Sequence, residues 1–438
     1  MERRLFLKGS ALGSMVAFFA SSNLSAVVLK DKDLLGFKAV SASTQDKVIV
    51  PQGYEAKVLI SWGDPLFSKA KPYDENKIID MNAVKNAHLV FGDNDDGMSF
   101  FPLSKNRGIL AVNNEYINPE IMFNHHGKNL SKEDILYEQA SVGVSILEIE
   151  KKGDDEMNEF IYKFVSKHKY KKDADTSKIL DEGILYVGQF NGKVGDFKGQ
   201  GKWIALEYGK NSLDEKNGFK SQAQVLINTR LAASIVGATP MDRCEWIASH
   251  KQSGSKEVFA TLTNNKNRQE PNAANPRTKN VYGQILKWMP KNSHKDDDFT
   301  WEIFALAGNP DNQQGLYKGS NNITSENKFN SPDGLKFDRD GRLWIQTDGS
   351  YSNKDEYEGM GNNCMLAANP KTGEIRRFLT GPIACELTGI AFSEDYTTMF
   401  VGIQHPGEGL KGSTFPYGKT PRSSVIMIRK LDGGVIGS

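Results

Sequence analysis

The sequence is poor in the features that mark several large enzyme classes. Its three cysteines, Cys244, Cys364 and Cys385, form no CxxC pair, so the spacing of a structural zinc site is missing. The seven histidines include no HxxH or HExxH pattern, which argues against a zinc hydrolase. GxSxG, P-loop and strand-linked GxGxxG motifs are also missing, so a serine hydrolase, an NTPase or a dinucleotide enzyme is not indicated. A disulfide framework is not indicated by three cysteines, although a Cys364–Cys385 bridge is possible in an oxidising compartment.

Neither sign of charge is in excess. The 438 residues include 55 basic and 54 acidic side chains, which gives a net charge of +1. This balance gives no reason to expect nucleic acid or an anionic membrane surface as a partner. The hydrophobic fraction of 38%, together with 41 glycines, is ordinary for a globular protein. The length allows one large β domain or two to three smaller ones.

The N-terminus contains a pair of arginines before a short apolar run. Arg3 and Arg4 precede Leu5, and the apolar run that follows is diluted by Gly and Ser. We therefore predict that residues 1–30 are a twin-arginine signal peptide, because the run is too weak for a spanning helix. The alternative is a basic amphipathic helix. The twin-arginine route carries folded proteins, so the export machinery is an expected partner and the expected location is periplasmic or secreted.

The rest of the chain reads as many short strands. β-branched and aromatic runs bounded by turn residues occur at 48–63, 108–114, 143–150, 183–191, 202–208, 257–265, 282–289, 301–308, 341–349, 398–405 and 423–430. Helical patterns are scarce, and the best candidates are 175–183 and 228–237. The sequence therefore predicts an all-β, β-propeller-like fold with short helical insertions, over a single domain spanning 31–438.

A weak internal repeat favours the propeller. Residues 331–349 and 385–405 share one form, in which an acid precedes an apolar strand, a polar turn and a second apolar strand. Asp333 and Glu386 head these two copies, and Glu245 heads a third at 242–265. A fourth copy, "DDGMSFFPLSKNRGILAVNNE", lies nearer the N-terminus. Units of this size match propeller blades, whose inner strands line a central channel, so these acids are expected to converge at one mouth of it.

Converging carboxylates suit a metal ion. Carboxylate and amide oxygens are ligands that calcium prefers, and clustered carboxylates repel one another unless a cation lies among them. However, Asp-Gly turns are also common between blades without any metal. The periodicity alone leaves both interpretations open.

Two further segments carry candidate site residues. Asn114 and Glu115 directly follow a strand, which makes Glu115 a candidate metal ligand and Asn114 a candidate substrate or metal contact. Arg243 and Glu245 are two positions apart, and the planar fork of an arginine suits phosphate. The alternatives are a capped turn for the first segment and a surface charge cluster for the second.

The chain resembles the PhoX-type alkaline phosphatases. The resemblance is carried by blocks in family order from Leu34 to Ser438, among them "DGMSFFP", "NNEYINPE", "GATPMDRCEW", "NSPDGLKFDRDGRLWIQTDG", "CELTGIAFS", "IQHPGE" and "PRSSVIMIRKLDGGVIGS". It implies a propeller-like monomer with a calcium and iron site that hydrolyses phosphate monoesters. By motif match it places Glu245 and Asp333 at metal-ligand positions and Arg243 at a phosphate-binding position. Glu115 and Glu386 match further ligand positions.

The sequence also departs from the family pattern. A family segment that contains the iron-binding cysteine and a glutamate ligand is missing after Glu150, where the chain passes through Lys151 and Lys152 to "GDDE". Cys244 replaces a customary proline next to Glu245 and is a candidate substitute for the lost iron ligand. Three hypotheses follow: a phosphatase impaired by this loss, a non-catalytic calcium-binding propeller, or, by fold analogy, a calcium-dependent lactonase.

Overall fold

The computed structural model of the chain describes residues 34–104, 107–150, 184–250, 254–350 and 352–438. The predicted signal peptide, the helix expected at 175–183 and the junction near Lys151 lie outside these residues.

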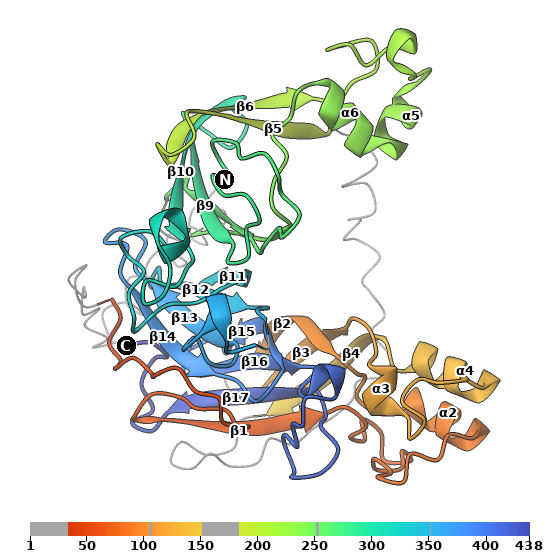
Figure 1. The fold of residues 1–438 in the computed structure, drawn as a ribbon. Helices are drawn as coiled ribbons and strands as arrows, with labels where there is room; N and C mark the ends of the chain where they lie inside the picture. Colours follow the sequence, from red (N-terminus) through yellow and green to blue (C-terminus); the bar gives the residue numbers. More distant parts are fainter. Residues whose placement is uncertain (1–33, 105–106, 151–183, 251–253, 351) are drawn as a thin grey trace, which may run out of the picture.

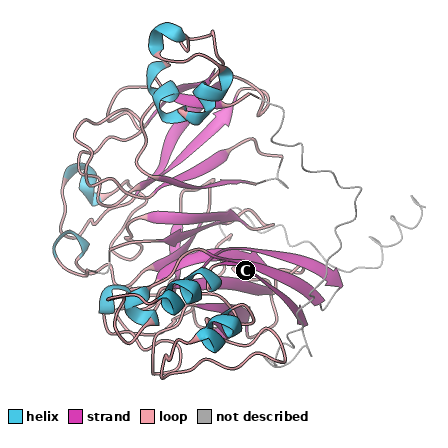
Figure 2. Cartoon of the chain, turned by 90° about the vertical axis from the view of Figure 1, so that its right-hand side faces the viewer, coloured by secondary structure: helices cyan, strands magenta, loops and turns pink. Residues whose placement is uncertain are grey.

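The described strands form four antiparallel sheets (Figures 1 and 2). The first sheet contains β2 (Asp95–Ser104), β3 (Arg107–Asn114) and β4 (Gly143–Glu150). The second has the order β5 (Tyr186–Asn191), β6 (Lys198–Ala205), β10 (Asp298–Leu306), β9 (Gln284–Pro290), β8 (Val258–Leu262) and β7 (Cys244–Ser249). The third contains β11 (Pro332–Phe337), β12 (Leu343–Thr347), β13 (Cys364–Ala368) and β14 (Ile375–Thr380). The fourth has the order β1 (Tyr54–Ser61), β17 (Ser424–Lys430), β16 (Thr398–Gln404) and β15 (Glu386–Phe392).

One strand of each sheet contacts a strand of a neighbouring sheet. β15 lies against β2, and β11 lies against both β15 and β7, so the sheets follow one another in an arc (Figure 1). We call β2, β7, β11 and β15 the inner strands. This arrangement confirms the predicted all-β, propeller-like fold.

The fourth sheet joins the two ends of the chain. β1 pairs with β17 from Tyr54 opposite Lys430 to Ser61 opposite Ser424. A shared core supports this pairing, in which Leu35 and Phe37 pack with Ile436 and with residues of β15 to β17. Burial of these apolar side chains is the main favourable term that holds the ends together.

Helices are short and lie at the periphery of the sheets (Figure 2). They are α2 (Met81–Ala87), α3 (Pro119–Met122), α4 (Lys132–Ala140), α5 (Gln222–Ile227) and α6 (Thr229–Ile235), besides single 3₁₀ turns. A capping box between Ser131 and Asp134 fixes the start of α4. The helix predicted at 228–237 is confirmed as α6. Among the described residues, no helix is long and apolar enough to cross a membrane.

All three cysteines are free thiols. Cys364 and Cys385 are buried in the core, whereas Cys244 is exposed at the start of β7. The Cys364–Cys385 bridge considered from the sequence is therefore not formed in this structure.

Candidate active site

The same local backbone pattern begins all four inner strands. A residue other than glycine adopts a left-handed conformation, with φ of +46° at Asn94, +45° at Arg243, +51° at Ser331 and +50° at Ala384. The residue two positions later is in each case an acid: Asp96, Glu245, Asp333 or Glu386. Such left-handed residues are uncommon outside glycine and cost free energy, and they cluster at functional sites. The fourfold occurrence therefore marks the acids as a matched set.

Irregular pairing then turns three of these acids out of the regular ladder. The register shifts between Asp95 and Met98 in β2, between Cys244 and Ile247 in β7, and between Pro332 and Leu335 in β11. Each interval contains the acid of its strand. Bulges of this kind re-aim a side chain, and they are enriched beside active sites. In β15 the shift comes later, between Thr388 and Ile390.

Arg243 ties three of the acids together. Its Nε lies 2.9 Å from Glu245 Oε1 and its Nη2 lies 2.6 Å from Asp348 Oδ2. Asp333 Oδ2 is 3.8 Å from the same Nη2. The Arg243 side chain is 46% exposed, so its guanidinium is reachable from solvent. Arg243 and Glu245, which were proposed from the sequence, therefore lie in direct contact, next to Asp333 of β11.

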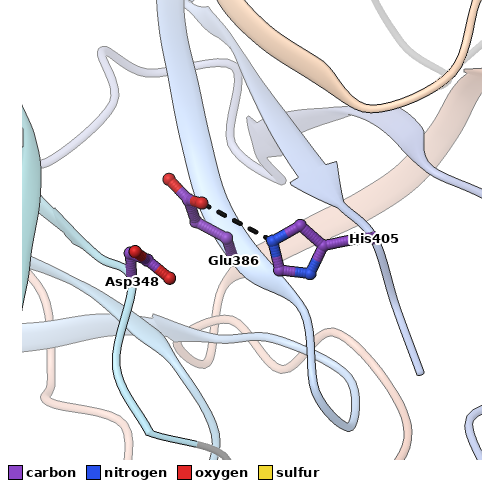
Figure 3. A group of neighbouring side chains, drawn as sticks. All are labelled: Asp348, Glu386 and His405. Atoms are coloured by element: carbon purple, nitrogen blue, oxygen red, sulfur yellow. Dashed lines mark ion pairs between the residues drawn. The ribbon is translucent and has the colours of Figure 1, made fainter. Parts of the chain in front are cut away.

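A second group adjoins the first. Asp348, at the end of β12, Glu386, at the start of β15, and His405, at the end of β16, each offer an atom within 4.8 Å of the other two (Figure 3). Glu386 Oε2 lies 3.6 Å from His405 Nε2. Two carboxylates and an imidazole at such separations are a donor set that suits a metal ion.

Glu115 belongs to the same region. It follows β3 and accepts a hydrogen bond of 3.0 Å from Gln404 Nε2. Burial raises its pKa, and the charges of Asp96 and Glu245 add to this effect. All four acids proposed as metal ligands, Glu115, Glu245, Asp333 and Glu386, are therefore brought together from four different sheets. Their role in binding metal stays a prediction.

Crowding shifts the proton equilibria of these groups strongly. Burial and the neighbouring carboxylates of Glu386, Glu245 and Asp348 raise the pKa of Asp333 to about 8, against the lowering effect of Arg243. Burial, with Asp348 and Asp96 nearby, raises the pKa of Glu386 well above its usual range. Without a cation, at least part of this cluster must hold protons near neutral pH. The residues present therefore fit a site for a hard cation such as calcium.

The structure places Asn114 differently from its acidic neighbour. The side chain is 3% exposed, and its Oδ1 accepts a hydrogen bond of 2.7 Å from Ser145 Oγ. Ser145 belongs to β4, so the side chain is bonded within the first sheet. A direct substrate contact by Asn114 stays a prediction that this burial does not support.

Three residues of the site were not proposed from the sequence: Asp96, Asp348 and His405. Asp96 lies in the fourth copy of the repeat, and the alignment of its left-handed Asn94 with the other copies could have identified it. Asp348 belongs to a "TDG" turn that sequence alone cannot separate from an ordinary turn. His405 had only its place before Pro-Gly as a signal.

The cysteines give no support to an iron–thiolate centre. Although Cys244 is exposed, desolvation of its thiol by the surrounding atoms, together with the charges of Glu245 and Asp242, raises its pKa to about 11, which favours the thiol over the thiolate that metals bind. Burial likewise raises the pKa of Cys385 well above its usual range. In the described residues, the candidate cation ligands are oxygen and imidazole donors.

Comparisons with known proteins agree on one family. The family model "Alkaline phosphatase PhoX" matches residues 35–154 and 152–407. The two matches meet where the sequence indicated a missing segment. A solved structure of Pseudomonas fluorescens PhoX, in complex with the transition-state analogue vanadate, is 35% identical and has a TM-score of 0.83. That alignment covers 92% of this chain and 99% of the other.

A second solved structure is much less similar. It is a gluconolactonase from Xanthomonas campestris, 10% identical over 90% of this chain and 98% of the other, with a TM-score of 0.27. A score this low does not support the lactonase hypothesis. No curated protein matches the chain.

Proposed function

The chain belongs to the PhoX alkaline phosphatase family, and from this we propose that it is a metal-dependent phosphatase that hydrolyses phosphate monoesters. One observation carries the proposal: acids that begin three inner strands, Glu245, Asp333 and Glu386, gather with Asp348 around the exposed guanidinium of Arg243. A cluster of carboxylates with raised pKa values beside an arginine is a functional-site signal rather than an ordinary surface charge cluster.

Arg243 is the group that binds the substrate in this proposal. Its planar fork presents two parallel N–H donors, which match two oxygens of a phosphoryl group. Its positive charge also favours the negative charge that spreads over those oxygens in the transition state. The contacts to Glu245 and Asp348 fix the orientation of the fork before substrate binds.

The carboxylates hold the cations. Glu115, Glu245, Asp333 and Glu386 are the proposed ligands, Asp348 and His405 lie beside Glu386, and Asp96 lies near Glu115 and Glu386. Bound calcium supplies positive charge that polarises phosphoryl oxygens. Iron is an expectation of the family resemblance, and no thiolate for it is offered by the described residues. We therefore propose calcium as the principal cofactor.

The cellular setting is also a proposal. The twin-arginine motif at residues 1–30 supports export and a periplasmic or secreted protein, with small phosphate esters as substrates and the export machinery as partner. A monomer of one propeller-like domain is expected.

The central test uses Glu245→Gln, which removes a charge and preserves the shape of the side chain. We expect hydrolysis of p-nitrophenyl phosphate in calcium to fall by at least ~100-fold, since a ligand and the Arg243 contact are both lost. Glu257→Gln is the matched control, because this carboxylate pairs with Lys287 on the second sheet. Calcium binding without turnover in the wild type would instead favour the non-catalytic calcium-binding propeller.

A further inference from the structure

A second polar cluster lies deeper than the candidate active site, where β2 begins and β16 ends. Asp95, the first residue of β2, is completely buried. Neither of its carboxylate oxygens has a hydrogen-bond partner among the described residues. An isolated carboxylate in the interior is very costly, so the side chain must receive either a proton or a cation.

Two buried amide oxygens accompany it. Asn94 Oδ1 and Gln404 Oε1 also have no hydrogen-bond partner in the described part of the chain. Their orientations are fixed by the other end of each amide, because Asn94 Nδ2 donates to the Tyr116 carbonyl at 3.1 Å and Gln404 Nε2 donates to Glu115 at 3.0 Å. A flipped amide would turn oxygen against oxygen at both places. The unpaired atoms are therefore oxygens.

The three side chains belong to one place in the fold. The side-chain amide nitrogen of Gln404 lies 3.5 Å from the backbone carbonyl oxygen of Asn94, which brings the end of β16 to the start of β2. Gly402, two residues earlier in β16, has no side chain, and a Cβ built there would lie 2.6 Å from Asp95 Oδ2. The Asp95 carboxylate thus points toward β16 and occupies the space that this glycine leaves.

Acceptors exceed donors in this cluster. Asp95, Asn94 and Gln404 together present four unpaired oxygens, and the neighbouring unpaired donor is Nδ2 of Asn114, the cross-strand partner of Asp95. Burial, with Asp93 and Asp96 nearby, raises the pKa of Asp95 well above its usual range, so protonation is the competing solution. One proton, however, supplies a single donor and leaves other oxygens unpaired, whereas a cation satisfies several oxygens at once.

We propose that this cluster binds a calcium ion, with the Asp95 carboxylate as charged ligand and the amide oxygens of Asn94 and Gln404 as neutral ligands. Oxygen-only donors of this kind suit a hard cation, and calcium accepts mixed carboxylate and amide ligands. The site is buried, so its ion does not meet the substrate. It links β2 of the first sheet to β16 of the fourth sheet.

The test measures calcium directly. Full-length protein is dialysed against calcium-free buffer, its calcium content is determined by elemental analysis, and its unfolding temperature is compared in EGTA and in calcium. We expect Asp95→Asn to lose one calcium per chain relative to the wild type and to show a smaller calcium-dependent rise in unfolding temperature. Glu386→Gln, in the candidate active site, should lower activity and still retain the buried ion.

Asp338→Asn is the matched control. Asp338 is also a buried aspartate, but it pairs with Arg342 and accepts a hydrogen bond of 2.9 Å from Trp344 Nε1. Its substitution should lower the unfolding temperature equally with and without calcium and leave the calcium count unchanged. The same result for Asp95→Asn would overturn the proposal and identify Asp95 as a protonated acid.

A measurement on the wild type covers the case in which Asp95→Asn does not fold. Anomalous scattering from crystals grown in calcium should show a peak beside the Asp95 carboxylate. An empty position there, with calcium present at the Arg243 region or absent from both, would reject the buried site independently of any phosphatase activity.

Discussion

At the scale of single residues, the decisive feature is a shared set of charges. Arg243 contacts Glu245 and Asp348 directly, and Asp333 lies only slightly farther away. Each carboxylate therefore influences the others, and no member can be changed without altering the proton equilibria of the rest. Two predictions follow from this coupling.

The first concerns the shape of the arginine. Arg243→Lys keeps the charge and removes the fork that binds two oxygens, so we expect inhibition by inorganic phosphate to weaken roughly tenfold. Competition assays with p-nitrophenyl phosphate measure this directly. Arg230→Lys, on α6, is the control and should leave inhibition unchanged. Equal phosphate affinity in Arg243→Lys and the wild type would remove Arg243 from the binding site.

The second concerns pH. Burial and the neighbouring carboxylates raise the pKa of Asp333 to about 8 in the folded protein, whereas the pKa of an aspartate in the unfolded chain is about 4. Between these values the folded state holds a proton that the unfolded state has released, so the metal-free protein should become less stable as pH rises through this interval. Urea unfolding at about pH 5 and about pH 8, on protein freed of metal beforehand by dialysis against EGTA at neutral pH, measures the trend. Asp333→Asn should flatten it, and stability that rises with pH would contradict this origin.

At the scale of elements, the acids are presented by backbone as much as by side chain. Gly389 shows how tight the arrangement is, because it lies in the bulge of β15 with φ of +46°, and a Cβ there would lie 2.1 Å from the Asp96 carbonyl oxygen. This contact brings the acid-bearing start of β2 against β15. A glycine is required both for the conformation and for the close approach.

Gly389→Ala should therefore separate the two inner strands. We expect a loss of stability of roughly 1–3 kcal/mol and a lower calcium content, since the backbone conformation is strained and the contact cannot be kept. Gly433→Ala is the control, because Gly433 has φ of +73° and no atom within 4 Å of a built Cβ. Equal effects of the two substitutions on calcium content would show that the β2–β15 contact does not support the site.

The sequence predicted some of the acids that these strands present and missed other residues of the site. Glu245, Asp333 and Glu386 were found because each heads a recognisable strand repeat, and period-2 patterns are local signals. Asp348 and His405 follow strands and reach the site only through the packing of the third and fourth sheets. Asn114 lies next to Glu115 in sequence, but Asn114 is hydrogen-bonded to Ser145 of β4, whereas Glu115, after the end of β3, is hydrogen-bonded to Gln404 of β16.

At the scale of the whole molecule, the first sheet, at one end of the arc, differs from the fourth sheet beside it. In the described residues β4 pairs with β3 alone, and its Val144 and Ile146 are 66% and 37% exposed. The family match breaks just after β4, at residues 152–154. The sequence indicated a missing segment there from the order of motifs, but strand pairing at this edge depends on distant parts of the chain and was not predictable.

The fourth sheet differs from the first because both ends of the chain pack into it. Ile436 is 1% exposed in the core shared with Leu35 and Phe37. Ile436→Ala should lower the free energy of unfolding by roughly 2–5 kcal/mol, because a cavity would form where the two ends meet. Urea unfolding measures the loss. Val435→Ala, at a half-buried neighbour, should cost about 1 kcal/mol or less, and an equal cost at both positions would contradict a shared core.

The pairing of β1 with β17 has a consequence for biosynthesis. Ser61 and Ser424, which are hydrogen-bonded across this pair, are 363 positions apart. At ribosomal speeds of about 5–20 residues per second, the nascent β1 waits roughly 20–70 s for its partner to emerge. During that interval β1 lacks its hydrogen-bonding partner, and a polypeptide truncated before β17 would leave β1 unpaired.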